Sequence, residues 1–121
     1  MAESLRCAVA LPHCVQVQTT ASNREEAGRI ADALLRRRLA ACVQVIGPVQ
    51  SRYWWHGELE ESEEWLCLAK TTEGRAEELI QAIGEAHSYE TPEIIVMAIV
   101  DGSEPYLRWV SDEVEEDELR A

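Results

Sequence analysis

The chain has 121 residues, of which 46% are hydrophobic and 28% are charged, a balance typical of one soluble globular domain. Its 11 lysines and arginines face 23 acids, and the resulting net charge of −12 argues against nucleic-acid binding, which needs a positive surface. No stretch is long and apolar enough to predict a membrane span.

The first twelve residues predict a flexible N-terminal extension. Their apolar run, residues 7–11, is too short to form the core of a signal peptide. The four cysteines form no C-x-x-C pair, and no histidine stands at zinc-finger spacing, so reduced thiols are favoured over a disulfide framework. We therefore expect a cytoplasmic protein.

The first two elements are a strand and a helix. Residues 13–21 alternate between apolar and polar side chains, which predicts a half-buried strand. A helix is expected over 22–38, with Ser22 as the N-cap and Glu25 as its capping-box partner. Three arginines, residues 36–38, close this helix, where their charges complement the helix dipole.

A hairpin is expected next. A long strand over 39–55 is interrupted at Gly47-Pro48, which predicts a bulge, a bend or an edge position, because proline cannot donate to a sheet ladder. A polar turn over 56–62 leads into a strand over 63–72.

Aromatic side chains on both faces of the first hairpin strand are the strongest sign of an oligomer. In the segment SRYWWHG, Tyr53 and Trp55 share one face while Trp54 lies on the other. One small sheet cannot bury both faces, so one of them is expected to meet another subunit or line a pocket. The alternative is an amphipathic hairpin whose Trp54 is half exposed.

The C-terminal part predicts a helix over 72–87, a well-buried strand over 92–102 and a short last helix. Ser103 would cap that helix, with Pro105 in its first turn. Tyr106, Val110 and Trp109 are expected to pack it onto the rest of the domain. The domain would span residues 13–113 and be followed by an acidic tail, residues 114–121.

The order of elements predicts the fold. Two βαβ units joined by a hairpin form the split βαβ, ferredoxin-like arrangement of the α+β class. Two helices would then cover one face of an antiparallel four-stranded sheet. Eleven of the 23 acids fall in residues 58–64 and 112–118, which indicates solvated segments or, alternatively, a diffuse cation-attracting surface.

The segment HSYETPE, residues 87–93, is the main candidate site. Glu93 follows Pro92 at the start of an expected buried strand, so it would need a partner, and Lys70 at the end of an earlier strand is the natural cation. The alternative is purely structural: a helix end with His87 near its C-terminus, hydrogen-bonded to the start of a strand. Serine-hydrolase, phosphate-loop, dinucleotide and zinc-protease motifs are absent, and we expect no enzyme.

These segments resemble the CutA family of divalent-cation tolerance proteins. The motifs LAACVQV, SRYWWHGELEE, LAKTT, HSYETPEI and YLRW occur in the family's order across residues 13–111. The resemblance implies a ferredoxin-like homotrimer, similar to the PII signalling proteins, with polar residues lining clefts between subunits. The residues that match this cleft are Ser51, Tyr53, Trp55, Lys70, Thr71, His87, Tyr89, Glu93 and Trp109.

The chain departs from the family pattern where metal binding is concerned. Ser88 replaces a usual proline and Gln44 a usual asparagine. A copper site with three ligands has been attributed to family members, and two of these ligands are missing here, because Thr19 and Ala86 stand at their positions. A metal would therefore need another set, and the candidates are His87, Glu93 and Cys42, which suit Cu²⁺ or Zn²⁺.

The leading functional hypothesis is a cytoplasmic trimer that supports tolerance of divalent metal ions. It would bind a metal ion or a small ligand in its inter-subunit clefts and require no cofactor. The alternative is a very stable adaptor or PII-like signalling trimer without a metal role. Acidic side chains at the hairpin and tail would then steer its partners.

Overall fold

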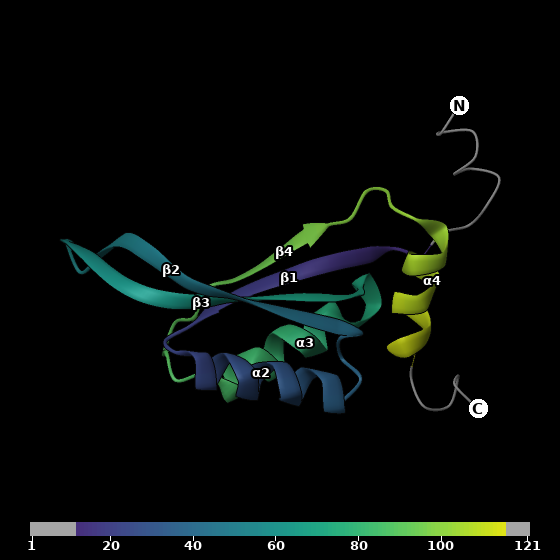
Figure 1. The fold of residues 1–121 in the computed structure, drawn as a ribbon, viewed down its shortest axis with the longest axis horizontal. Coiled ribbons are helices and arrows are strands. Elements are labelled where there is room, and N and C mark those ends of the chain that lie inside the picture. The colour runs from purple at the N-terminus through teal and green to yellow at the C-terminus, as the bar shows by residue number, and fades with distance from the viewer. Residues whose placement is uncertain (1–11, 116–121) are drawn as a thin grey trace.

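A computed structural model of the chain describes residues 12–115. The elements follow in the order β1 (Cys14–Ala21), α2 (Arg24–Arg36), β2 (Cys42–Trp55), β3 (Glu58–Thr72), α3 (Glu73–Ala86), β4 (Ile94–Ala98) and α4 (Glu104–Glu113). The sheet has the order β2-β3-β1-β4, and every neighbouring pair is antiparallel. Helices α2 and α3 lie on one face of the sheet, and α4 lies at one end (Figure 1). The predicted ferredoxin-like α+β fold is confirmed.

The ends of the chain bear on two of the expected boundaries. The extension expected over 1–12 and the tail expected over 114–121 lie almost wholly outside the described residues. Val114, however, is 1% exposed, so the packed domain extends past residue 113. Within residues 12–115, no helix is both long and apolar enough to cross a membrane.

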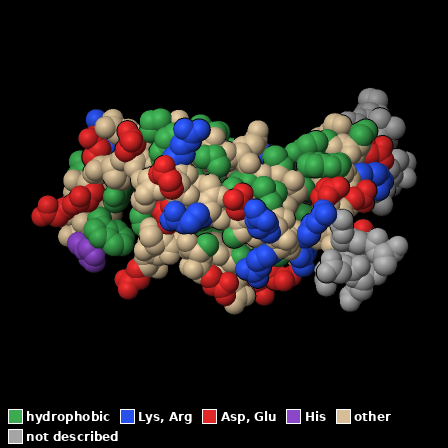
Figure 2. All heavy atoms as spheres, turned by 60° about the horizontal axis from the view of Figure 1, so that its bottom comes forward, with side chains coloured by type: hydrophobic (Ala, Val, Ile, Leu, Met, Phe, Trp, Pro, Cys, Tyr) green, Lys and Arg blue, Asp and Glu red, His purple; other side chains and the backbone are tan. Residues whose placement is uncertain are grey.

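The main core lies between the sheet and the two long helices. Strands β1 and β3 contribute alternate residues to it, which is the two-residue period of a pleated sheet with one covered face. The largest side chains come from the helices, with Ile30 and Leu34 on α2 and Leu79 and Ile83 on α3, all at most 1% exposed. Figure 2 shows basic and acidic side chains interspersed over the helix side of the molecule.

The boundary between α2 and β2 differs from the expected one. The backbone N–H groups of Leu39 and Ala40 both donate to Leu34 O, at 2.9 and 3.3 Å, and so finish the helix. These two residues are buried, and β2 begins only at Cys42, three residues later than expected.

The hairpin turn is shorter than predicted. It consists of His56 and Gly57 alone, and β3 already begins at Glu58, so the polar turn expected over 56–62 is wrong. Both residues have positive φ, 50° and 78°, which is the requirement of a two-residue turn that matches the twist of the strands. Residues 58–62 therefore belong to a strand whose side chains are exposed except for the half-buried Ser62, and the hairpin extends beyond the rest of the sheet (Figure 1).

The interruption at Gly47-Pro48 is a bulge, as predicted. The register shifts between Ile46 and Val49, and the Gly47-Pro48 peptide bond is cis. The ring of Trp65 on β3 lies against Gly47, so closely that a Cβ added there would overlap the ring. Glycine is thus required at this position by a close approach of the backbone to a side chain.

Replacing Gly47 with alanine should lower the free energy of unfolding by about 2 kcal/mol, because the bulge or the Trp65 ring must shift. Gly28→Ala on the exposed side of α2 is the matched control, since a Cβ there meets nothing within 4 Å. That control should raise stability by about 0.5–1 kcal/mol through helix propensity. Chemical denaturation of the two variants checks the prediction, and equal effects would contradict it.

Strand β4 is shorter and far more exposed than expected. It spans only Ile94–Ala98, at the sheet edge beyond β1, and Ile95, Val96 and Met97 are 45%, 41% and 36% exposed. The prediction of a well-buried strand over 92–102 is therefore wrong for a single chain. A continuous apolar run shows that a strand avoids water, but it does not show which surface covers the strand.

The last helix packs with residues other than those expected. Ser103 is its N-cap and Pro105 lies in its first turn, as predicted. Leu107 and Val110 are buried against Cys14, whereas Tyr106 and Trp109 are 41% and 42% exposed, with ring centroids 5.6 Å apart. Of the three predicted packing residues, only Val110 is buried.

Candidate functional site

A hollow of about 480 Å³ opens beside the base of the β2–β3 hairpin. We call it the hairpin hollow. The strands contribute Thr20, Ser51, Arg52, Tyr53, Trp55 and Glu64 to its lining. The loop between α3 and β4 contributes Tyr89, Glu90, Thr91 and Glu93. Five of the nine predicted cleft residues thus meet in one place, namely Ser51, Tyr53, Trp55, Tyr89 and Glu93.

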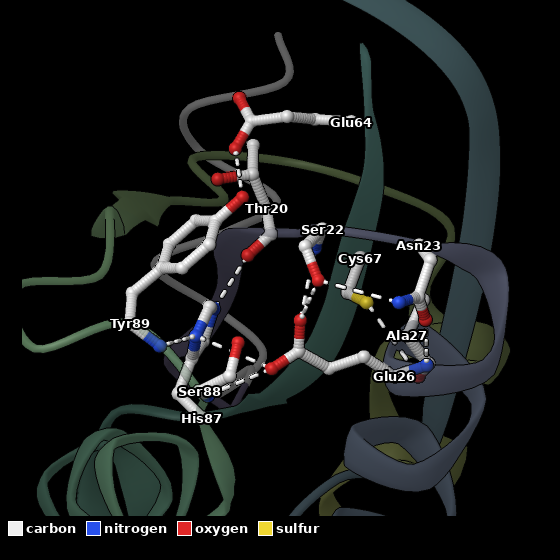
Figure 3. Close-up of polar contacts among 10 residues, drawn as sticks. All are labelled: Thr20, Ser22, Asn23, Glu26, Ala27, Glu64, Cys67, His87, Ser88 and Tyr89. Carbon is white, nitrogen blue, oxygen red and sulfur yellow. Dashed lines mark hydrogen bonds and ion pairs between the residues drawn. The ribbon is translucent and has the colours of Figure 1, made fainter. Parts of the chain in front are cut away.

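A tyrosine–carboxylate pair lies in the hairpin hollow. The Tyr89 hydroxyl donates to Glu64 Oε2 at 2.8 Å, and Glu64 is only 7% exposed (Figure 3). Burial raises the pKa of Tyr89, and the bond to Glu64 and its negative charge raise it further. Tyr89 is therefore a neutral hydrogen-bond donor at physiological pH. Glu64 was not predicted as a site residue, because its position in an acidic run made it look solvated.

His87 holds the loop that carries Tyr89. Its side chain is 0% exposed, and its Nε2 lies 2.5 Å from Thr20 O, while the Tyr89 N–H donates to its Nδ1 at 3.1 Å (Figure 3). Since Nδ1 accepts from the Tyr89 N–H, Nε2 is the nitrogen that donates to Thr20 O, and Nδ1 also lies 3.6 Å from Glu26 Oε2. Both nitrogens are thus engaged by the backbone. The structural alternative expected a bond to the start of a strand, whereas the contact is with Thr20, near the end of β1.

Glu26 holds the same loop through the backbone N–H of Ser88. Its Oε1 accepts from Ser22 N and Oγ at 2.9 and 2.8 Å, and its Oε2 accepts from Ser88 N at 2.7 Å. Burial by itself would raise the pKa of this carboxyl, but the bonds from Ser22 and Ser88 outweigh it and lower the pKa to about 2. Glu26 is therefore a buried carboxylate that ties the start of α2 to the end of α3.

The capping of α2 is shifted by one residue from the expected pattern. Asn23 is the N-cap, and its side chain accepts from Glu26 N at 2.8 Å, while Glu26 reaches back to Ser22. The prediction of Ser22 with Glu25 is wrong, because Asn23 and Glu26 have the same three-residue spacing and place the glutamate inward. That spacing is the signal in the sequence that could have revealed Glu26.

The structure does not bring the predicted metal ligands together. His87 is buried behind Tyr89, whereas Glu93 is exposed and accepts from Gln18 Nε2 at 2.8 Å. Cys42 lies at the other end of β2, where it pairs with Lys70. Within residues 12–115 no three histidine, cysteine or acidic side chains form a group that could hold a metal ion. The set of His87, Glu93 and Cys42 is therefore not a metal site within one chain.

Of the other four predicted cleft residues, His87 holds the loop of Tyr89, and the remaining three lie away from the hairpin hollow. Lys70 donates to Gln44 Oε1 at 2.8 Å and does not pair with Glu93, contrary to expectation. Thr71 is 0% exposed, and its Oγ1 has no hydrogen-bond partner among residues 12–115. Trp109 is on α4. These three lie toward the α4 end of the sheet, so one chain holds the predicted cleft as two separated halves.

Comparison with known proteins gives one consistent result. Residues 15–113 match the family described as CutA1 divalent ion tolerance protein. The chain is 35% identical over 100 residues to the divalent-cation tolerance protein CutA of Thermotoga maritima, covering 83% of this chain and 98% of that protein. It is 33% identical over 98 residues to the chloroplastic protein CutA of Arabidopsis thaliana, covering 81% of this chain. That match spans about half of the plant protein, 54% of its length.

Solved structures agree with the sequence comparison. The structure described as the periplasmic divalent cation tolerance protein CutA of Archaeoglobus fulgidus superposes with a TM-score of 0.82 at 36% identity. The match covers 84% of this chain and 99% of that one.

Proposed function

Because the chain belongs to the CutA1 divalent ion tolerance family, we propose that it acts in divalent-ion tolerance as a homotrimer that reversibly binds a small ligand. The observation that carries this proposal is the hairpin hollow, with aromatic rings and carboxylates around about 480 Å³ of space. Pockets of this size and mixed lining are typical of small-molecule sites. The relatives are named for tolerance, and we propose binding in place of catalysis.

The trimer is supported by apolar side chains that a single chain leaves in water. On β4, Ile95 and Val96 are 45% and 41% exposed, and on the hairpin Trp54 and Leu59 are 73% and 65% exposed. Exposed apolar surface of this extent is typical of a face that meets another protein.

Replacing Ile95 with glutamate should dissociate the trimer, because a charge would then be buried at the interface between copies. Light scattering should give three times the mass of one chain for the wild type and a lower mass for the variant. Ile80→Glu is the control, since Ile80 is 36% exposed on α3 and outside the proposed interface. A monomeric wild-type protein would refute the trimer.

Direct binding of a metal ion is a separate candidate for the hairpin hollow. The hairpin hollow offers carboxylate oxygens, and these favour Mg²⁺, Ca²⁺ or Mn²⁺ over Cu²⁺ or Zn²⁺. Calorimetric titration of the assembled protein with Cu²⁺ and Zn²⁺ tests the original expectation. A tight, stoichiometric heat signal for either metal would require ligands supplied by two copies together.

A scaffold or PII-like signalling trimer is the second candidate. The side chains of His87 and Glu26 form their hydrogen bonds with the backbone and with Ser22, so neither is free for a ligand. This observation favours the second candidate. A trimer that bound no small ligand would leave this candidate as the better one. The relatives are described from two different compartments, so a cytoplasmic location also stays a proposal.

A further inference from the structure

The hairpin hollow combines aromatic walls with an excess of negative charge. Tyr53, Trp55 and Tyr89 supply three aromatic rings, and Glu64, Glu90 and Glu93 supply three carboxylates. Aromatic faces attract cations through the negative charge of their π-systems.

Glu64 is the most deeply buried of the three carboxylates in the hairpin hollow. It is 7% exposed, and within residues 12–115 its side chain accepts a hydrogen bond from the Tyr89 hydroxyl at Oε2 (Figure 3). A buried carboxylate is costly unless a cation or several donors compensate it. One neutral hydroxyl donor does not supply that compensation, and the hollow gives a ligand access to the carboxylate.

The described part of the chain supplies no cation for these carboxylates. The salt bridges within residues 12–115 involve none of Glu64, Glu90 and Glu93. Arg52 lines the hollow, but its Nε is bound to Glu61 Oε2 at 2.7 Å, and its side chain is 71% exposed. No salt bridge within residues 12–115 therefore compensates these carboxylates, and a bound cation would do so.

An organic cation fits this lining better than a metal ion. A divalent metal needs several oxygens that converge on one point, and no group of three possible ligands occurs in the described residues. An alkylammonium or guanidinium ion needs only one carboxylate for its charged head and apolar or aromatic surface for its stem.

We infer that the hairpin hollow is a site for a small organic cation, with Glu64 receiving the charged head and Trp55 and Tyr53 covering its stem. Glu93, at the exposed rim, adds a second negative charge. This inference rests on the proposed function, because it names the ligand class for the same hollow.

Titration of the full-length wild-type trimer with n-butylammonium chloride tests the inference by calorimetry and by tryptophan fluorescence. Saturable binding is expected, and n-butanol, which has the same stem without the charge, should bind about tenfold more weakly. Potassium chloride at equal concentration controls for ionic strength. Equal affinity for the two ligands, or no saturable butylammonium binding, would overturn the inference.

Variants locate the charged head. Glu64→Gln should weaken butylammonium binding by about tenfold, and Trp55→Leu by about fivefold. The matched control is Glu63→Gln, because Glu63 is adjacent in sequence but on the opposite face of β3. If Glu64→Gln fails to fold, Glu93→Gln serves as the test, because it removes the second negative charge and should also weaken butylammonium binding. Wild-type affinity for butylammonium in every folded variant of Glu64 and Glu93 would refute the site.

A lysine or arginine side chain of a second copy has the same chemistry as a free organic cation. If butylammonium bound only to the dissociated Ile95→Glu variant, a neighbouring copy would be filling the hollow, and a free ligand would be excluded. A monomeric wild-type protein would refute the proposed trimer. A trimer that binds butylammonium no better than n-butanol would refute only the organic-cation site.

Discussion

Replacing His87 with alanine is expected to lower the free energy of unfolding by about 4 kcal/mol while leaving metal affinity unchanged. The change removes a side chain that is 0% exposed and leaves Thr20 O and the Tyr89 N–H without their partner. His87→Gln should recover part of the loss, because its amide can still donate to Thr20. Chemical denaturation measures the first effect, and calorimetry with Cu²⁺ and Zn²⁺ measures the second.

The control for His87 is His13→Ala. The His13 side chain is exposed, while its backbone oxygen accepts from Glu73 N and is not altered by the substitution. We expect its effect on stability to be within about 0.5 kcal/mol. A His87→Ala protein of wild-type stability that bound metal tenfold more weakly would instead support a metal-ligand role for His87.

Replacing Glu26 with glutamine should lower the free energy of unfolding by about 3 kcal/mol near pH 7. The pKa of this carboxyl falls from an ordinary value of 4.5 to about 2 on folding. Each pKa unit corresponds to about 1.4 kcal/mol. Glu26 is 1% exposed, so solvent screens little of the interaction between its carboxylate and its hydrogen-bond donors. Glu25→Gln on the same turn is the control, since Glu25 is exposed.

The pH dependence of stability identifies the same group. Because the folded-state pKa is the lower one, the stabilisation is fully present above pH 4.5 and is lost as the pH falls toward about 2. Wild-type protein should lose about 3 kcal/mol more across this window than Glu26→Gln, whose amide does not titrate. Parallel pH profiles for the two proteins would contradict this assignment.

The bond from Ser88 to Glu26 needs a backbone N–H at position 88. Proline, which the resemblance to the family leads one to expect there, has no N–H and could not form this 2.7 Å bond to Glu26 Oε2, whereas any other residue could. The network was missed at the sequence level because Glu26 and Ser88 are 62 residues apart. The capping spacing of Asn23 and Glu26 indicates an inward glutamate, but nothing in either segment indicates that Ser88 is its partner.

The sequence by itself determined the fold and the family. Changes in hydrophobic period, from two in the strands to 3.6 in the helices, identified each element, and these local patterns are encoded in consecutive residues. The resemblance carried by five short motifs then identified cleft residues, of which Ser51, Tyr53, Trp55, Tyr89 and Glu93 do line one hollow.

Only the tertiary structure decided how those residues are used. It joined His87 to Tyr89, separated Lys70 and Cys42 from Glu93, and revealed Glu64 as a buried carboxylate that forms no salt bridge within residues 12–115. It also left β4 uncovered within one chain. The physical reason is that a residue's type and spacing fix its local conformation, whereas its burial and partners depend on surfaces brought together by distant segments and by other copies of the chain.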